Sequence, residues 1–142
     1  MSRRSLLARC KILDKSRVVI TLAPGTTVLP LNLVGTNIKI TDKDNTVLYS
    51  APAQASTNNL VIPAAPTDNQ YTIEVVKVTS LYLNSGSSLQ KVLEFKIKNE
   101  ALVRMSSCHN LTEVRNIDVS ACTVVNLFDN CQIGRASCRE RV

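Results

Sequence analysis

The residues best suited to covalent chemistry in this chain are Cys108 and His109, a thiol followed directly by the only histidine. A thiolate activated by an imidazole is a common enzymatic nucleophile, and a third group then orients the ring. Consecutive side chains on a strand point to opposite sides, however, and no Asp or Asn is evidently placed to orient His109. The four glycines form no phosphate-binding loop. We therefore expect a protein that is not an enzyme and has no catalytic residues.

The cysteines lack the spacing of a metal site. Structural zinc is held by Cys and His ligands that commonly come in Cys-x-x-Cys pairs, and no such pair occurs among Cys10, Cys108, Cys122, Cys131 and Cys138. We expect no metal and no cofactor. The positions of Cys108 and Cys131 in the chain would suit a disulfide between successive coils of a repeat. The oxidation state of Cys108, Cys122 and Cys131 stays open.

The positive charge of the chain is concentrated at its ends. The formal net charge is +6, of which residues 1–17 contribute +5 and residues 133–142 contribute +2. Residues 18–132 hold eight Lys or Arg against nine Asp or Glu, so the body of the protein has no basic excess to neutralise phosphates. With three Tyr, two Phe and no Trp, aromatic platforms for single strands are also scarce. We expect no nucleic-acid partner.

The chain shows no hydrophobic run of the roughly 18 residues that a membrane-spanning helix needs. Its basic start is followed by only three apolar residues, Leu6, Leu7 and Ala8, which is too short for the apolar region of a signal peptide. We expect no membrane insertion, and no signal peptide is visible.

Apolar residues recur in the C-terminal third at a fixed offset of 22 positions. Val92, Phe95, Ile97 and Leu102 return as Val114, Ile117, Val119 and Val124. The second copy fits the leucine-rich-repeat pattern L-x-x-L-x-L-x-x-N/C-x-L, with Val and Ile in place of Leu and Cys122 at the N/C position. The spacing predicts coils that stack strand on strand, with Val92 beside Val114 and Phe95 beside Ile117.

The chain as a whole divides into four segments by composition. Residues 1–16 form a basic N-terminal arm, residues 17–78 a β-rich sandwich-like domain, and residues 79–132 the cap and about two coils of the repeat. Val78, Leu81 and Leu83 have the repeat spacing but precede Val92 by too few residues to be in register, so they are interpreted as a divergent cap. Residues 133–142 are excluded from the fold because they resemble a translated sequencing adapter. On that interpretation, the chain is a fragment cut inside its repeat array.

Within the β-rich segment, alternating runs rich in Val, Ile, Thr and Tyr predict short strands. These are residues 17–22, 27–34, 37–41, 46–50, 60–63 and 71–78. Polar and proline-containing stretches at 50–59 and 63–69 predict surface loops, and residues 42–45 predict a hairpin turn. The fold class predicted is mainly β, an antiparallel sandwich-like domain followed by the first coils of a solenoid.

Residues 116–125, Asn-Ile-Asp-Val-Ser-Ala-Cys-Thr-Val-Val, resemble the "LDVS-x-C-TAL" phrase of bacterial surface or phage-borne leucine-rich-repeat proteins. Residues 130–132, Asn-Cys-Gln, resemble the phrase that follows it in that family. The resemblance is confined to the C-terminal third of the chain, and the first copy departs from it by carrying Asn99 one position early. It implies an extracellular or cell-surface location, with a virion as the other setting.

The function expected is a binding scaffold that recognises a protein or glycan ligand on the strand face of its coils. The solvent-facing candidates are Glu94, Lys96, Arg115, Asn116 and Asp118, whose mixed charge suits a polar interface. The alternative is a structural or host-recognition component of a phage virion. The ligand and the oligomeric state stay open at this point.

Overall fold

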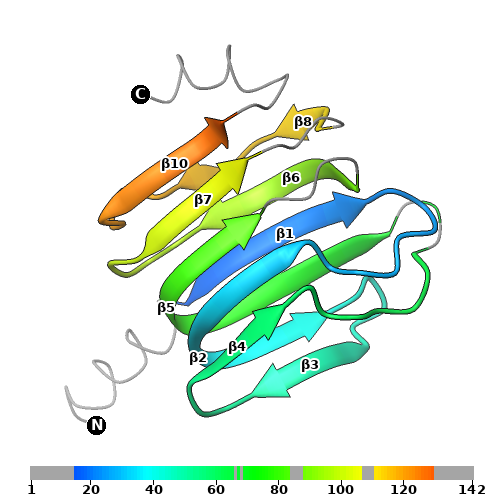
Figure 1. Cartoon of the computed structure of the whole chain (residues 1–142), viewed down its shortest axis with the longest axis horizontal. Coiled ribbons are helices and arrows are strands. Elements are labelled where there is room, and N and C mark those ends of the chain that lie inside the picture. The colour runs from blue at the N-terminus through cyan, green and yellow to red at the C-terminus, as the bar shows by residue number, and fades with distance from the viewer. Residues whose placement is uncertain (1–14, 66, 68, 84–87, 107–110, 130–142) are drawn as a thin grey trace, which may run out of the picture.

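The structure is a computed structural model that describes residues 15–65, 67, 69–83, 88–106 and 111–129. These residues form ten strands and no helix, so the prediction of a mainly β protein is confirmed. The strands are β1 Ser16–Leu22, β2 Leu31–Thr41, β3 Val47–Ala51, β4 Ala55–Asn58, β5 Gln70–Leu83, β6 Leu89–Lys96, β7 Leu102–Ser106, β8 Glu113–Val114, β9 Ile117–Asp118 and β10 Val124–Asp129. All of them join one mixed sheet (Figure 1).

The two longest strands, β2 and β5, change direction near their middles. In β2 the buried positions shift phase between Gly35 and Ile38, and Asn37 between them has a φ of 56°, a left-handed conformation that Asn tolerates better than most residues. In β5 Val76 and Lys77 are both exposed, which breaks the alternation in the same way. Gly35 allows the strands to approach closely here, because a Cβ on it would lie 2.6 Å from the carbonyl oxygen of Lys77.

The bends divide the sheet into two walls. The β1–β6 wall consists of β3, residues 38–41 of β2, residues 70–75 of β5, β1, β6, and finally β8 and β9. The β7–β10 wall consists of β4, residues 31–34 of β2, residues 80–83 of β5, β7 and β10. Figure 1 shows the strands of each wall following one another side by side.

The repeated offset of 22 positions is the register in which the parallel strands pair. In the β1–β6 wall Val92 pairs with Val114 and Phe95 with Ile117. In the β7–β10 wall Leu102 pairs with Val124, again 22 positions on. The two copies of the apolar pattern therefore lie strand against strand, as their spacing predicts.

The prediction that Val78, Leu81 and Leu83 fall out of register is wrong. Leu81 pairs with Val103 and Leu83 with Met105, at the same offset of 22. The error arose from comparing this segment with β6, whereas its partner is β7 in the other wall. The end of β5 is thus one strand of the parallel ladder.

The two walls share one hydrophobic core. Its fully buried members come from both walls and include Ile20 and Phe95 on one and Leu33, Leu81 and Val103 on the other. β1 lies antiparallel between residues 70–75 of β5 and β6, so residues 17–78 and 79–132 meet in one ladder. The strands form one open mixed sheet, and the finer predictions of a sandwich followed by a solenoid are not confirmed by it.

Several predicted strand limits need correction. The runs 27–34 and 37–41 are largely one strand, β2, which starts after Pro30 because proline has no N–H for the ladder. Residues 27–30 and 60–63 were predicted to lie in strands, but they form only an isolated antiparallel bridge between Val28 and Val61. The predicted loop at 50–59 contains β4, because its polar residues pair with the outer edge of β2. Residues 1–14, Cys108, His109, Cys131 and the adapter-like residues 133–142 lie outside the described residues.

Candidate partner-binding face

The five predicted face residues all lie on β6 or on the segment from β8 to β9. Glu94 and Lys96 belong to β6, Arg115 and Asn116 connect β8 to β9, and Asp118 ends β9. Lys96 and Asp118 are neighbours in the parallel register. All five are at least partly exposed, so the structure brings the predicted set together on one part of the β1–β6 wall.

Most charges on this face are paired with one another. Glu94 forms an ion pair with Arg17 of β1, with 3.8 Å between Arg17 Nε and Glu94 Oε1. Glu113 interacts with both Arg115 (Nε to Oε2, 3.3 Å) and Lys91 (Nζ to Oε1, 3.7 Å). These pairs are exposed and each contributes only a few tenths of a kcal/mol, up to about 1 kcal/mol. They do, however, neutralise the face locally.

Four further charged residues belong to this face and were not among the predicted ones: Arg17, Lys91, Lys98 and Glu113. Lys91 and Glu113 were detectable, because they are separated by the same offset as the apolar pattern and carry opposite charges. Arg17 was not detectable from spacing, since an antiparallel strand from the start of the chain carries it into the sheet.

Asn116 shapes the backbone of this face and connects it to β6. Its φ is 56°, and this left-handed residue breaks the edge strand into β8 and β9. Its Nδ2 donates a hydrogen bond of 3.0 Å to the carbonyl oxygen of Leu93, and the N–H of Phe95 donates to the Asn116 carbonyl at 3.0 Å. Asn116 therefore fastens the outer strand segment to β6.

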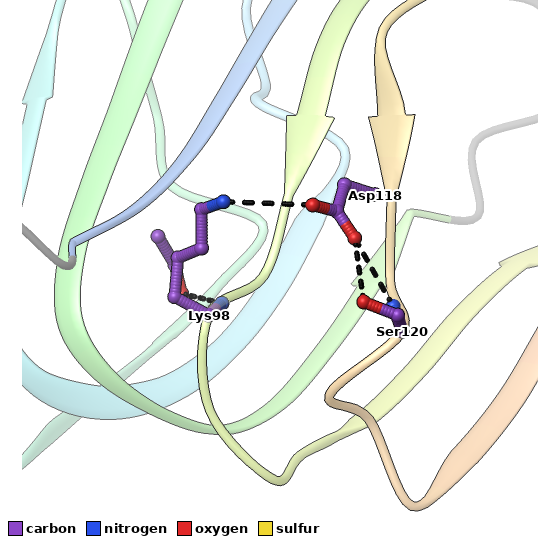
Figure 2. A network of polar contacts seen from close by, with 4 residues as sticks. Lys98, Asp118 and Ser120 are labelled. Carbon is purple, nitrogen blue, oxygen red and sulfur yellow. Dashed lines mark hydrogen bonds and ion pairs between the residues drawn. The ribbon is translucent and has the colours of Figure 1, made fainter.

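Asp118 is the centre of a small polar network at the end of the face (Figure 2). Lys98 Nζ lies 3.5 Å from Asp118 Oδ2, and the Ser120 hydroxyl donates to Oδ1 at 2.9 Å. Ser120 N–H also points to Oδ1, at 3.3 Å. The hydrogen bonds from Ser120 and, less strongly, the charge of Lys98 lower the pKa of Asp118, so the carboxylate stays ionised to more acidic pH.

Cys122, the residue at the N/C position, lies partly buried against the core as a free thiol. Burial, and after it the negative charge of Asp118, raises the pKa of this thiol. A raised pKa reduces the thiolate fraction at neutral pH and with it the nucleophilic character. The environment of Cys122 thus suits packing better than redox chemistry.

A surface groove of about 560 Å³ lies at the bend of the β1–β6 wall, with Lys15, Lys39 and Glu74 among its lining residues. Lys39 and Glu74 are cross-strand neighbours of opposite charge. Within the described residues, no three His, Cys, Asp or Glu side chains are grouped so as to hold a metal ion. The described part of the chain also contains no helix with the length and apolar character to cross a membrane.

No protein-family model matches the chain, and no curated protein or solved structure matches it either.

Proposed function

We propose that this protein is a non-enzymatic binding scaffold of the leucine-rich-repeat type, in which coils of one constant length stack to display polar strand faces. The observation that carries the proposal is the constant register. Leu81, Val103 and Val125 follow one another in the β7–β10 wall at a fixed offset of 22 positions. Phe95 and Ile117 make the same step in the other wall.

Polar side chains at the turns support the same interpretation, because they bind the backbone one coil earlier. Asn99 Nδ2 donates to the carbonyl of Val78 at 2.7 Å, and Asn99 Oδ1 accepts from the N–H of Val78 at 2.9 Å. Thr123 Oγ1 donates to the carbonyl of Ala101 at 3.1 Å, one repeat offset earlier. Buried or half-buried turn backbone needs such partners. Asn99 therefore satisfies the backbone groups of Val78, although it stands one position early in the repeat pattern.

The face around β6, β8 and β9 suits recognition through polar contacts. Lys96 makes no ion pair among the described residues, and it stands between Arg17 and Asp118 in the register. Arg115 is exposed and shares Glu113 with Lys91. A protein or glycan ligand with carboxylates or hydroxyls would find the unpaired ammonium group of Lys96 here, close to the exposed guanidinium of Arg115.

The test is a binding screen of the full chain on arrays of immobilised proteins and glycans, followed by affinity measurements on the ligand that emerges. We expect the double variant Lys96→Ala/Arg115→Ala to weaken that ligand about tenfold, which corresponds to about 1.4 kcal/mol. Lys43→Ala, an exposed lysine in the turn between β2 and β3, is the matched control. Mass spectrometry should recover the ligand unchanged. Chemical conversion of the ligand, or no ligand on either array, would contradict the proposal.

A further inference from the structure

Two straight rows of side chains cross the outer face of the β7–β10 wall. The polar row, one residue from each strand, consists of Asn58, Asn32, Tyr82, Arg104 and Asn126. The second row, two positions away on every strand, consists of Ser56, Val34, Ser80, Leu102 and Val124. Neighbours within each row are direct cross-strand partners.

Strand alternation places both rows on the solvent side. On the three central strands, the residues between the rows are Leu33, Leu81 and Val103, which are completely buried, and side chains on a strand alternate between its two faces. Arg104, Asn58 and Asn126 are exposed, and Asn32 and Tyr82 are partly exposed. Leu102 and Val124 are 36% and 49% exposed, respectively, which adds an apolar strip beside the polar row.

Arg104 is the only cation in these strand segments, and it has no ion pair among the described residues. The single acidic residue in the same segments is Asp129, at the end of β10. The remaining polar groups of the row are three amides and a phenol. An unpaired guanidinium surrounded by neutral donors and acceptors can bind an anionic group such as a carboxylate through two parallel hydrogen bonds.

We propose that the polar row binds an extended acidic polysaccharide, a β-linked chain that carries uronate carboxylates. Neighbouring strands are about 4.8 Å apart, close to the length of one sugar unit in an extended β-linked chain, so successive sugars meet successive strands. Arg104 binds a carboxylate, and the Asn amides, which both donate and accept, bind hydroxyl groups. The apolar strip and the Tyr82 ring cover the C–H faces of the sugars.

The side-chain oxygen of Asn32 is a hydrogen-bond acceptor without a donor in the described part of the chain, so it is available to a ligand. Its Oδ1 is buried and accepts no hydrogen bond within the described residues. Turning this amide toward a sugar hydroxyl breaks no hydrogen bond to that oxygen, and it satisfies an acceptor whose desolvation is otherwise uncompensated. The row thus gains hydrogen bonds on ligand binding.

This inference rests on the proposed function only in that the protein binds a ligand, because the polar row lies on the other wall from Lys96 and Arg115. The two ideas therefore fail separately. A protein that binds an array ligand through the β6, β8 and β9 face but binds no acidic sugar would overturn the polysaccharide proposal alone.

The experiment is isothermal titration calorimetry of the full chain with hexamannuronate and with cellohexaose, an acidic and a neutral β-linked hexasaccharide. We expect hexamannuronate to bind about tenfold more tightly than cellohexaose. Arg104→Ala should remove most of that preference, and Arg104→Lys should restore only part of it because lysine lacks the two-pronged geometry. Asn126→Ala should weaken both sugars by a smaller factor. Thermal unfolding of each variant verifies that it is folded.

Lys43→Ala is the control cation and should bind both sugars as the parent chain does. Equal binding of the two hexasaccharides, or hexamannuronate affinity unchanged in Arg104→Ala, would overturn the proposal. Tighter binding of a single-stranded oligonucleotide than of hexamannuronate would also overturn it, since the site would then select phosphate.

Discussion

The outer face of the β1–β6 wall carries paired charges, whereas that of the β7–β10 wall carries one unpaired arginine among amides and apolar groups. In the first wall, the repeat offset places Lys91 beside Glu113 and Lys96 beside Asp118. In the second it places Arg104 beside Asn126. One register therefore produces two surfaces: the first pairs most of its charges and leaves Lys96 without an ion pair among the described residues, and the second carries a single cation, Arg104, with no carboxylate partner among them.

The walls also differ in regularity. The β6 edge is covered by two very short strands, β8 and β9, separated by the left-handed Asn116. The β7 edge is covered by the single, longer strand β10. Broken, charged edges discourage further strand pairing, and continuous apolar edges permit it. Four predictions test this comparison.

The largest effect is expected at the bend from which both walls diverge. Gly35→Val should destabilise the protein by about 3 kcal/mol, because the new Cβ would collide with the backbone oxygen of Lys77 and with Val75 Cγ1. Urea unfolding followed by circular dichroism measures the change. An unaltered unfolding midpoint would show that the walls do not depend on this close approach.

A smaller effect separates the inner strand β7 from the outer strand β10 in the β7–β10 wall. Val103 and Val125 are direct partners, yet Val103 is completely buried and Val125 is 45% exposed. Val103→Ala should reduce the free energy of unfolding by about 2 kcal/mol, and Val125→Ala by about 0.5 kcal/mol. Equal losses in chemical denaturation would mean that β10 is covered in solution by something further.

Two asparagines provide a matched test across the walls. Asn116→Ala should cost about 1–2 kcal/mol, because it loses the hydrogen bond to Leu93 and places Ala at a positive φ. Asn126→Ala should change stability by less than about 0.5 kcal/mol, since that side chain is exposed and has no hydrogen bond among the described residues. The comparison fails if thermal unfolding ranks the two variants in the opposite order.

The smallest effect concerns acid. The pKa of Asp118 is lowered in the folded protein, so the carboxylate contributes stability above its ordinary pKa of about 3.9. That contribution disappears as the pH falls through the lower, folded value. Asp118→Asn should therefore flatten the acid limb of the stability profile by about 0.5 kcal/mol or less, because the group is largely solvated. Urea midpoints measured from about pH 5 to about pH 2 test this. An unchanged acid limb would show that the contacts of Asp118 with Lys98 and Ser120 do not stabilise the β1–β6 wall.

Sequence spacing was a good guide where β6 pairs in parallel with β8 and β9, it was misapplied at the parallel pair β5–β7, and it gave no information on antiparallel pairing. Val92 with Val114 was predictable because both residues belong to one repeating pattern. Tyr82, Arg104 and Asn126 follow one another at the same offset of 22 positions and could have been recognised in the same way. Asn32 and Asn58 could not, because β2 and β4 run antiparallel to their neighbours and share no constant offset with them.

The amino-acid sequence by itself determined the strand character, the inward-facing apolar positions and the offset of 22 positions at which the parallel strands pair. These follow from local alternation and from a repeated pattern, both of which act along the chain. Only the tertiary structure decided that β1 enters between β5 and β6, that β2 and β5 bend into two walls, and that five strands align Asn58 with Asn126. Those choices depend on which distant backbone edges exchange hydrogen bonds and bury a common core, and such long-range pairing leaves no periodic mark in the sequence.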